Sequence, residues 1–240
     1  MPRFFVESGD PEEIVITGED ARHIGRSLRM RVGEELTVCA QGMDYQCKIV
    51  RITDTDVYLH PETITPCAAE PTVNVTLYQA VPKQDKFAEI VQKAVELGAV
   101  RIVPVLTARC VARPTKADFE KKRDRLQKIA LSAAKQSGRG IIPEVSGLLT
   151  WKEALTEMQQ QDIAVMLYEE QGGVRFGEVP LAEKRNVGLF IGSEGGISEE
   201  EAAQAVDAGL HRVWLGKRIL RCETAPTAAI SVLMYLTGNL

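Results

Sequence analysis

The chain has 240 residues, of which 45% are hydrophobic and 26% charged, and its formal net charge is −4. These values are typical of a globular protein, and no apolar run reaches the roughly 18 residues that a membrane span needs. The first residues, MPRFFVESGD, lack the apolar core of a secretion signal, so the sequence predicts a cytoplasmic protein.

The cysteines predict neither a disulfide framework nor a metal site. The five cysteines form no CxxC pair and have no regular spacing, and the three histidines are scattered. An odd number of cysteines without metal-ligand spacing is typical of reduced thiols in a reducing compartment. We therefore expect no metal ion.

Basic residues concentrate in the middle of an otherwise acidic chain. Residues 71–150 hold 14 Lys and Arg against 7 Asp and Glu, whereas residues 1–70 and 151–240 both carry an excess of acid. A local basic segment suggests an anionic partner for that part of the chain. The alternative is that residues 116–128 form the solvated face of a helix, and charge alone does not decide between the two.

Residues 1–68 are predicted to form a small β-rich domain, because short strands separated by turn residues are typical of a barrel or sandwich. The predicted strands are residues 3–6, 14–16, 35–39, 45–50 and 57–59. A helix is expected at residues 21–28, after the second strand. Residues 63–72 read as a linker, since Pro66 and Pro71 break any periodic pattern.

One basic cluster stands out in this acidic domain. It comprises Arg22, His23, Arg26, Arg29 and Arg31. Three of its arginines, at 22, 26 and 29, fall at helical spacing, so the predicted helix should present them on one side. Guanidinium groups form paired hydrogen bonds with phosphate, which favours contact with nucleic acid. The alternative is ion pairing with the neighbouring acids Glu19, Asp20 and Glu34.

Residues 73–240 alternate strands with helices, which predicts an α/β domain with a mostly parallel sheet. The predicted strands are residues 73–80, 100–105, 163–168, 187–191 and 212–215. The predicted helices are residues 83–97, 117–136 and 151–160, and a last one that starts beside Pro226. Ser198 and Glu201 form a capping-box pattern, so a further helix should begin there.

Two unusual loops follow the strands at residues 187–191 and 212–215. The first loop contains Gly192, Glu194, Gly195 and Gly196, and the second covers residues 215–225. Ligands of open α/β sheets bind at the carboxyl ends of the strands, and glycines allow backbone amides to approach a ligand. We therefore expect the two loops to lie side by side and to hold a small-molecule cofactor.

The second loop is the more specific of the two. Arg218 and Arg221 flank the apolar pair Ile219 and Leu220, which would suit a pocket floor for an adenine ring beside a developing negative charge. The alternatives are a tight turn with a solvated Glu194 and a surface loop with two solvated arginines. Neither loop contains GxGxxG or GxxxxGK[ST], the phosphate-binding patterns of nucleotide enzymes.

Several motifs carry a resemblance to a known family. They are RFF at residues 3–5, HIGRSLRMRVGE at 23–34, KQDK at 83–86, QKAVELG at 92–98, PVLTAR at 104–109, QSGR at 136–139, IGSEGG at 191–196 and LGKRILRCETA at 215–225. With these motifs the chain resembles, over nearly its whole length, the bacterial 16S rRNA uridine-N3 methyltransferases of the SPOUT superfamily of knotted methyltransferases. One departure is Ser193, where the family usually has proline, and we expect it to loosen the turn slightly.

The resemblance implies a fold and a cofactor. Residues 1–68 would be a PUA-like β-barrel that binds RNA, and residues 73–240 a SPOUT domain with a C-terminal trefoil knot that holds S-adenosylmethionine. The protein would be a homodimer with its active sites near the interface. By motif position, the cofactor contacts would be Leu167, Tyr168, Gly192, Glu194, Gly195, Gly196, Leu215, Gly216, Ile219, Leu220, Arg221, Thr224 and Ala225.

The implied reaction is methylation of N3 of one uridine in 16S rRNA, at position 1498 in the usual rRNA numbering. Arg221 is the candidate that stabilises the uracil anion, with Arg218 behind it, and Glu194 or Glu223 is a candidate general base. The target base must be exposed in order to react. The expected RNA contacts are Arg3, Arg22, His23, Arg26, Arg29, Arg31, Arg109, Lys135 and Arg139.

Three other functions stay open at the level of sequence. A related SPOUT enzyme would methylate a ribose 2′-hydroxyl or a tRNA base, but the PUA-like domain and LGKRILRCETA disfavour it. A non-catalytic RNA-binding or ribosome-assembly protein would keep the same fold. A nucleotide-dependent α/β enzyme is disfavoured by the absence of both phosphate-binding patterns.

Overall fold

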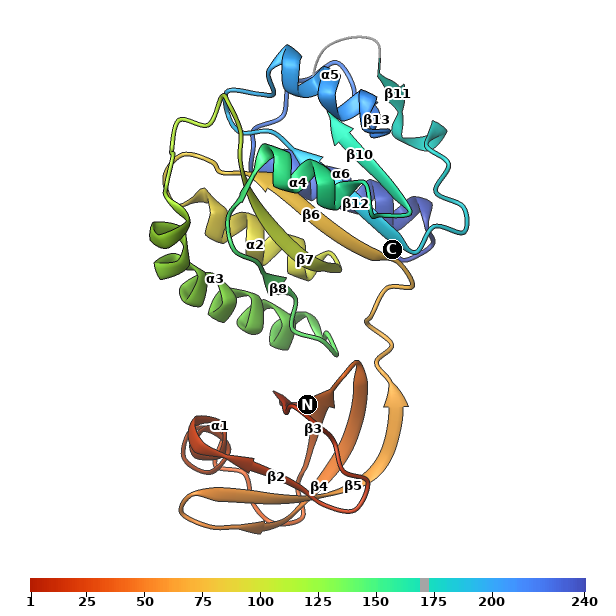
Figure 1. The fold of residues 1–240 in the computed structure, drawn as a ribbon. Coiled ribbons are helices and arrows are strands. Elements are labelled where there is room, and N and C mark those ends of the chain that lie inside the picture. The colour runs from red at the N-terminus through yellow and green to blue at the C-terminus, as the bar shows by residue number, and fades with distance from the viewer. Residues whose placement is uncertain (169–172) are drawn as a thin grey trace. The chain divides into compact units, whose positions relative to one another are not determined.

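In a computed structural model of the chain, residues 1–168 and 173–240 are described, and they form two compact units (Figure 1). The first unit consists of residues 1–70 and 134–141, and the second of residues 71–133 and 142–240. The end of a long helix and the loop after it therefore belong to the first unit. A single boundary drawn along the sequence cannot represent this division.

The first unit is built on a five-stranded sheet in the order β1-β3-β4-β5-β2. Its strands are β1 (Arg3–Phe5), β2 (Ile14–Thr17), β3 (Glu35–Ala40), β4 (Met43–Ile52) and β5 (Asp56–Pro66). Neighbours pair antiparallel except β1 and β3, which are parallel. The hydrogen-bonded path does not close, so the sheet is a curled half-barrel where the sequence predicted a barrel or sandwich.

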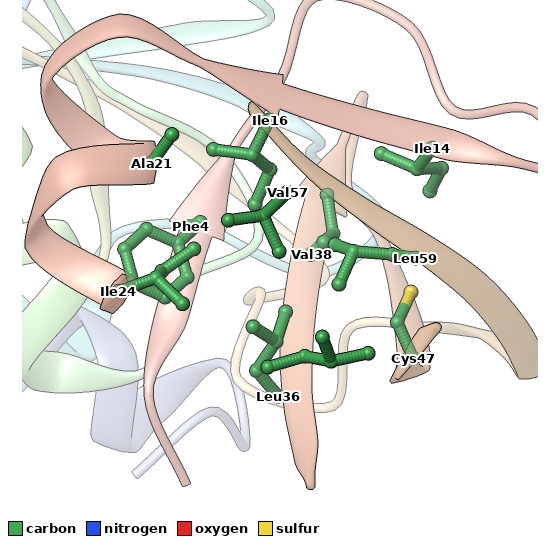
Figure 2. Packing of buried hydrophobic residues seen from close by; sticks show 11 residues of the cluster. Phe4, Ile14, Ile16, Ala21, Ile24, Leu36, Val38, Cys47, Val57 and Leu59 are labelled. Carbon is green, nitrogen blue, oxygen red and sulfur yellow. The ribbon is translucent and has the colours of Figure 1, made fainter. Parts of the chain in front are cut away.

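Alternation of inward and outward side chains along the strands creates the core of this unit. In β2, Ile14 and Ile16 are buried whereas Val15 and Thr17 are exposed, because successive side chains of a strand point to opposite faces. Figure 2 shows the cluster that these strands share with the first helix. Its members are Phe4, Ile14, Ile16, Ala21, Ile24, Leu36, Val38, Cys47, Ile49, Val57 and Leu59. Burial of each large aliphatic or aromatic member contributes about 1.5–3 kcal/mol, which holds the helix on the sheet.

The helix after β2 is not the single α-helix that the spacing predicted. α1 (Gly18–Arg22) runs into a π-helical turn, η1 (His23–Ser27). The amide of Leu28 donates to the carbonyl of His23 at 2.9 Å, five residues back. Arg29 lies beyond the turn in a left-handed conformation, with φ of 54°. The expectation that three arginines share one helical face is therefore wrong, because a π turn changes the angular spacing of side chains.

The second unit is built on a parallel sheet in the order β11-β13-β10-β12-β6-β7-β8, with β9 paired to β7. Its strands are β6 (Asn74–Ala80), β7 (Ala99–Leu106), β8 (Glu144–Val145), β9 (Leu149–Thr150), β10 (Ile163–Leu167), β11 (Val174–Arg175), β12 (Asn186–Ile191) and β13 (His211–Trp214). Its helices are α2 (Lys86–Glu96), α3 (Lys116–Ser137), whose end lies in the first unit, α4 (Trp151–Met158), the 3-10 turn η2 (Phe176–Glu178), α5 (Glu199–Asp207) and α6 (Thr224–Leu236). The predicted mostly parallel α/β arrangement is confirmed.

The central strands of this sheet are buried on both faces. β6, β10 and β12 are buried almost without interruption, which is typical of a parallel sheet covered by helices. Tyr78 and Phe190 are paired in register. Both contact α4: the Tyr78 hydroxyl donates to Glu157 at 2.8 Å, and the ring of Phe190 packs against that of Trp151. Because the strands run parallel, their carboxyl ends share one edge of the sheet.

None of the helices in residues 1–168 and 173–240 is both long and apolar enough to span a bilayer.

Candidate active site

A cavity of about 360 Å³ lies at the carboxyl edge of the parallel sheet, where β10, β12 and β13 end. β10 lies between the other two strands, and the loops after β12 and β13 nevertheless both line this cavity. The intervening strand brings Leu167 and Tyr168 to the cavity wall. A cavity of this size can enclose a small organic molecule.

Most of the predicted cofactor residues come together around this cavity. Those in the lining are Leu167, Tyr168, Gly192, Glu194, Gly196, Leu215, Gly216, Ile219, Leu220, Arg221 and Ala225. Gly195 and Thr224 are not part of the lining. The lining also includes Ser193, Lys217, Arg218 and Cys222 from within the two predicted loops, and from outside them Lys86, Ile191, Ile197, Val213 and Trp214.

The loop after β12 packs so tightly that side chains would not fit. A Cβ atom on Gly195 would lie 2.7 Å from the carbonyl oxygen of Arg109. Gly196 has φ of 70°, a left-handed conformation that favours glycine. Ser193 is buried, and its hydroxyl donates to the carbonyl of Arg109 at 3.4 Å, a bond that proline could not make. Contact with Arg109 therefore fixes the path of this loop.

The capping box predicted at the start of α5 is confirmed. The amide of Glu201 donates to the Ser198 hydroxyl at 3.2 Å, and the Glu201 carboxylate accepts from Ser198 in return. The same carboxylate accepts the amide of Ala108 at 2.7 Å. Glu201 thus ties the helix to the loop after β7. The amino end of α5 contributes a partial positive charge beside the cavity, which Ile197 lines just before it.

Lys86, at the start of α2, is the functional candidate that the sequence did not reveal. Its Nζ lies 3.2 Å from Glu194 Oε1 and 3.1 Å from Glu223 Oε2. Glu194 also accepts the amide of Lys83 at 3.0 and 3.1 Å, and the Cys222 thiol donates to Glu223 at 3.2 Å. One ammonium group therefore binds a carboxylate from each of the two loops. KQDK marked this stretch as distinctive, but no spacing linked it to residues more than 100 positions away.

These contacts decide how the two carboxylates ionise. Burial alone would raise the pKa of Glu194, but hydrogen bonds from backbone amides, Cys222 and Lys86 outweigh it and keep that pKa below its usual value. The Cys222 thiol, a backbone amide and Lys86 lower the pKa of Glu223 to about 2. Burial and the two carboxylates raise the pKa of Cys222 to about 12. Carboxylates with lowered pKa values bind protons weakly, so neither is suited to act as a general base at neutral pH.

The loop after β13 presents its cations to solvent at the rim of the cavity. Lys217, Arg218 and Arg221 are exposed, and within the described residues none of them has a carboxylate partner. Ile219 is 84% exposed, so it is not part of the buried pocket floor that the sequence predicted. The rim therefore combines positive charge with one accessible apolar side chain.

The predicted RNA-contact residues fall into two groups. Arg22, His23, Arg26, Arg29, Arg31 and Arg109 are exposed, and none of their side chains has a carboxylate partner in the part of the chain that the structure describes. The others form ion pairs: Arg3 with Asp44 at 2.6 Å, Lys135 with Asp20 at 2.9 Å, and Arg139 with Glu70 at 2.8 Å. Arg139 is only 2% exposed, so it cannot reach a phosphate while its ion pair holds.

The basic face of α3 is mostly neutralised by its surroundings. The ion pairs are Lys116 with Glu153 (2.7 Å), Lys121 with Asp118 (3.4 Å), Arg123 with Glu120 (2.8 Å) and Arg125 with Asp85 (2.7 Å). This pairing favours the interpretation of residues 116–128 as a solvated helix face.

In the described ranges, no group of three or more His, Cys, Asp and Glu residues is placed to hold a metal ion. The five cysteines are buried and free.

Comparison with known proteins places the chain in a family. A family model for an RNA methyltransferase domain matches residues 69–234, and one for an RNA methyltransferase PUA domain matches residues 16–62. The chain is 33% identical to ribosomal RNA small subunit methyltransferase E of Bacillus subtilis, over 99% of this chain and 97% of that protein. It is 30% identical to the protein of that name from Mycobacterium bovis, over 94% and 87%.

A solved structure gives the same assignment. The ribosomal RNA small subunit methyltransferase E from Neisseria gonorrhoeae, bound to S-adenosyl methionine, is 31% identical, covers 98% of each chain and superposes with a TM-score of 0.87. The chain therefore belongs to the RNA methyltransferase family whose curated members are named ribosomal RNA small subunit methyltransferase E.

Proposed function

We propose that the protein transfers a methyl group from S-adenosylmethionine to N3 of a uridine in 16S rRNA, at position 1498 in the usual numbering. The observation that carries this proposal is the cavity at the ends of β10, β12 and β13. It is supported by 31% identity over 98% of the chain to a relative bound to S-adenosyl methionine.

The residues around the cavity fit this cofactor. Leu167, Leu215 and Leu220 supply apolar surface for an adenine ring, and the glycine loop leaves backbone free to approach a ligand. Glu194 can accept a hydrogen bond from a hydroxyl or ammonium group. When bound, S-adenosylmethionine supplies an electrophilic methyl group on a sulfonium centre.

Arg221 is the residue that we assign to the chemistry of the uracil. N3 must release its proton to water before it can attack the methyl group, which leaves negative charge on the ring, and S-adenosylhomocysteine then departs as the leaving group. A guanidinium held at the cavity rim without a carboxylate partner in the described residues can stabilise that charge. Since the pKa values of Glu194 and Glu223 are lowered, we assign them no proton transfer. Positioning of the uracil supplies the remaining acceleration.

The finer architecture also belongs to this proposal. We infer that the first unit acts as a PUA-like RNA-binding module and that the chain around β12, β13 and α6 is tied in a trefoil knot. A homodimer is supported by the exposed apolar side chains of Tyr235 and Leu236 at the end of α6. A protein acting on ribosomal RNA would work in the cytoplasm.

RNA contact is assigned to the exposed cations that have no carboxylate partner within the described residues. In the first unit these are Arg22, Arg26, Arg29 and Arg31, to which the exposed side chain of His23 is added, and in the second Arg109, Lys217 and Arg218 accompany Arg221. Cations that already pair with acids gain less from a phosphate, because that contact would first have to break an existing ion pair. Arg3, Lys135 and Arg139 are therefore left out of the interface.

Salt dependence of RNA binding distinguishes these two groups of cations. Arg26→Ala and Arg109→Ala should each weaken RNA binding and reduce the slope of log affinity against log salt by about 1, because each removes one phosphate contact. Filter binding to 16S rRNA fragments across a salt series measures this slope. Arg123→Ala on α3, which removes a cation paired with Glu120, is the matched control and should leave the slope unchanged. If all three variants reduced the slope equally, RNA would be attracted by the overall positive charge and not by these particular side chains.

Methyl transfer by the purified protein tests the proposed function. With methyl-labelled S-adenosylmethionine and small ribosomal subunits or naked 16S rRNA, label should appear in 3-methyluridine. Label in a 2′-O-methyl nucleoside or in tRNA would favour a related SPOUT enzyme. Failure to bind S-adenosylmethionine in calorimetry would favour a non-catalytic RNA-binding protein.

Two glycine variants link this activity to the cavity. Gly195→Val should abolish cofactor binding, because its side chain would collide with the carbonyl of Arg109. Gly147→Ala is the control, since a Cβ atom there meets nothing within 4 Å. Equal activity of the two variants would show that methyl transfer does not depend on this cavity.

A further inference from the structure

We propose that Lys86 is a positioning residue that clamps the loops after β12 and β13 together through Glu194 and Glu223, and so keeps the cofactor cavity formed. This inference rests on the proposed use of the cavity for S-adenosylmethionine. The three side chains, here called the Lys86 clamp, come from separate parts of the chain. Lys86 begins α2, Glu194 lies after β12, and Glu223 directly precedes α6.

The geometry of the clamp makes its single positive charge necessary. Both carboxylates lie within hydrogen-bond distance of one nitrogen, so the two bonded oxygens are at most about 6 Å apart. The side chains of Lys86, Glu194 and Glu223 are 26%, 22% and 18% exposed, so water screens their charges only in part. Without the ammonium group the carboxylates would repel each other and drive the loops apart.

The two loops depend on Lys86 to different degrees. Glu194 has further attachments, because the amide of Lys83 donates to both of its oxygens and the Cys222 thiol also bonds it. Glu223 is held by Lys86 and by the thiol of its own neighbour, Cys222. Loss of Lys86 would therefore release mainly the loop after β13. That loop contains Arg221, two residues before Glu223, so the clamp serves both cofactor binding and the placement of the reacting base.

The Lys86→Met variant removes the charge and keeps much of the volume of the side chain. Its affinity for S-adenosylmethionine, measured by calorimetry at about pH 8, should fall about tenfold. The affinity should recover as the pH is lowered to about 5.5, because repulsion raises carboxylate pKa values and a bound proton relieves the repulsion. The wild-type protein should lack this recovery, since the pKa values of both carboxylates are lowered and they stay ionised over this pH range. A steric role of Lys86 would not produce this pH profile.

Other titratable groups near the clamp are the same in the wild-type protein and in Lys86→Met, so their effects cancel when the two pH profiles are compared. They are Cys222, which bonds Glu223, and Tyr168, Lys217, Arg218 and Arg221, which line the same cavity. Among the described lining residues there is no histidine. The difference between the two pH profiles therefore reports on Glu194 and Glu223.

Three control variants test whether charge is the cause. Lys86→Arg keeps the charge and should bind within about threefold of wild type. The triple variant Lys86→Met, Glu194→Gln, Glu223→Gln has no repulsion to relieve, so it should bind better than Lys86→Met at about pH 8 and lose its pH dependence. Lys93→Met, on the same helix but in an exposed pair with Glu89, should behave as wild type.

Several results would overturn the clamp. One is wild-type affinity of Lys86→Met, and another is an equal loss in Lys86→Met, Lys86→Arg and the triple variant. If Lys86→Met does not fold, a folded and binding triple variant supports the clamp, and an unfolded one overturns it. Absence of S-adenosylmethionine binding by the wild-type protein would instead contradict the proposed function, so the two failures are distinguishable.

Discussion

Replacement of Arg221 by alanine should reduce the rate of methyl transfer by about a hundredfold or more, which corresponds to about 2.7 kcal/mol of transition-state stabilisation. Arg221 is exposed at the cavity rim and has no carboxylate partner among the described residues, so its charge is available to the uracil anion. Because this anion forms only during reaction, the effect should appear in kcat more than in KM. Single-turnover rates with saturating cofactor and 16S rRNA measure it directly.

Two comparisons separate this role from a loss of structure. Arg221→Ala should unfold at the wild-type urea concentration, because exposed side chains contribute little to stability. Arg221→Lys should recover only part of the rate, since an ammonium group keeps the charge without the planar fork of a guanidinium. Turnover equal to wild type in Arg221→Ala would remove Arg221 from the mechanism.

The Arg139→Ala variant should lose about 3 kcal/mol of folding stability, because it leaves a partly buried carboxylate without its partner. The guanidinium of Arg139 donates to both oxygens of Glu70, at 2.9 Å from Nε and 2.8 Å from Nη2. Glu70 Oε1 also accepts the amides of Gly140 and Ile141, at 2.7 and 3.1 Å. The pair therefore fastens the segment 134–141 within the first unit.

Urea unfolding of Arg139→Ala and of Arg26→Ala measures this difference. Arg26 is exposed, so its removal should change the free energy of unfolding by no more than about 0.5 kcal/mol while RNA binding weakens. Arg139→Ala should thus lose stability and keep its RNA affinity, whereas Arg26→Ala should keep its stability and lose RNA affinity. Weaker RNA binding by a fully stable Arg139→Ala variant would show instead that Arg139 contacts RNA, as the sequence predicted.

The periodic parts of the fold were predictable from local pattern. The amphipathic helix α2 buries apolar residues at helical spacing, and β6 and β12 are short segments rich in apolar residues between turns, so their positions follow from the sequence alone. The capping box at Ser198 was recognisable for the same reason. The strands β8, β9 and β11 have two residues each, which is too short for a period to show.

Features that depend on distant contacts were not predictable. The sequence identifies Arg139 as a cation but does not reveal that Glu70 buries it, and it places Arg29 on a helix that a π turn has already ended. Glu194 and Glu223 were candidate bases because they are carboxylates. Their lowered pKa values depend on backbone amides, on Cys222 and on Lys86, and the fold brings Lys86 from another part of the chain.

Nucleoside mass spectrometry of 16S rRNA from a strain that lacks the gene tests whether this protein methylates N3 of the uridine. We expect 3-methyluridine to disappear from 16S rRNA and to return when the wild-type gene, but not the Arg221→Ala variant, is supplied. Unchanged 3-methyluridine in the deletion strain would show that another enzyme makes this modification.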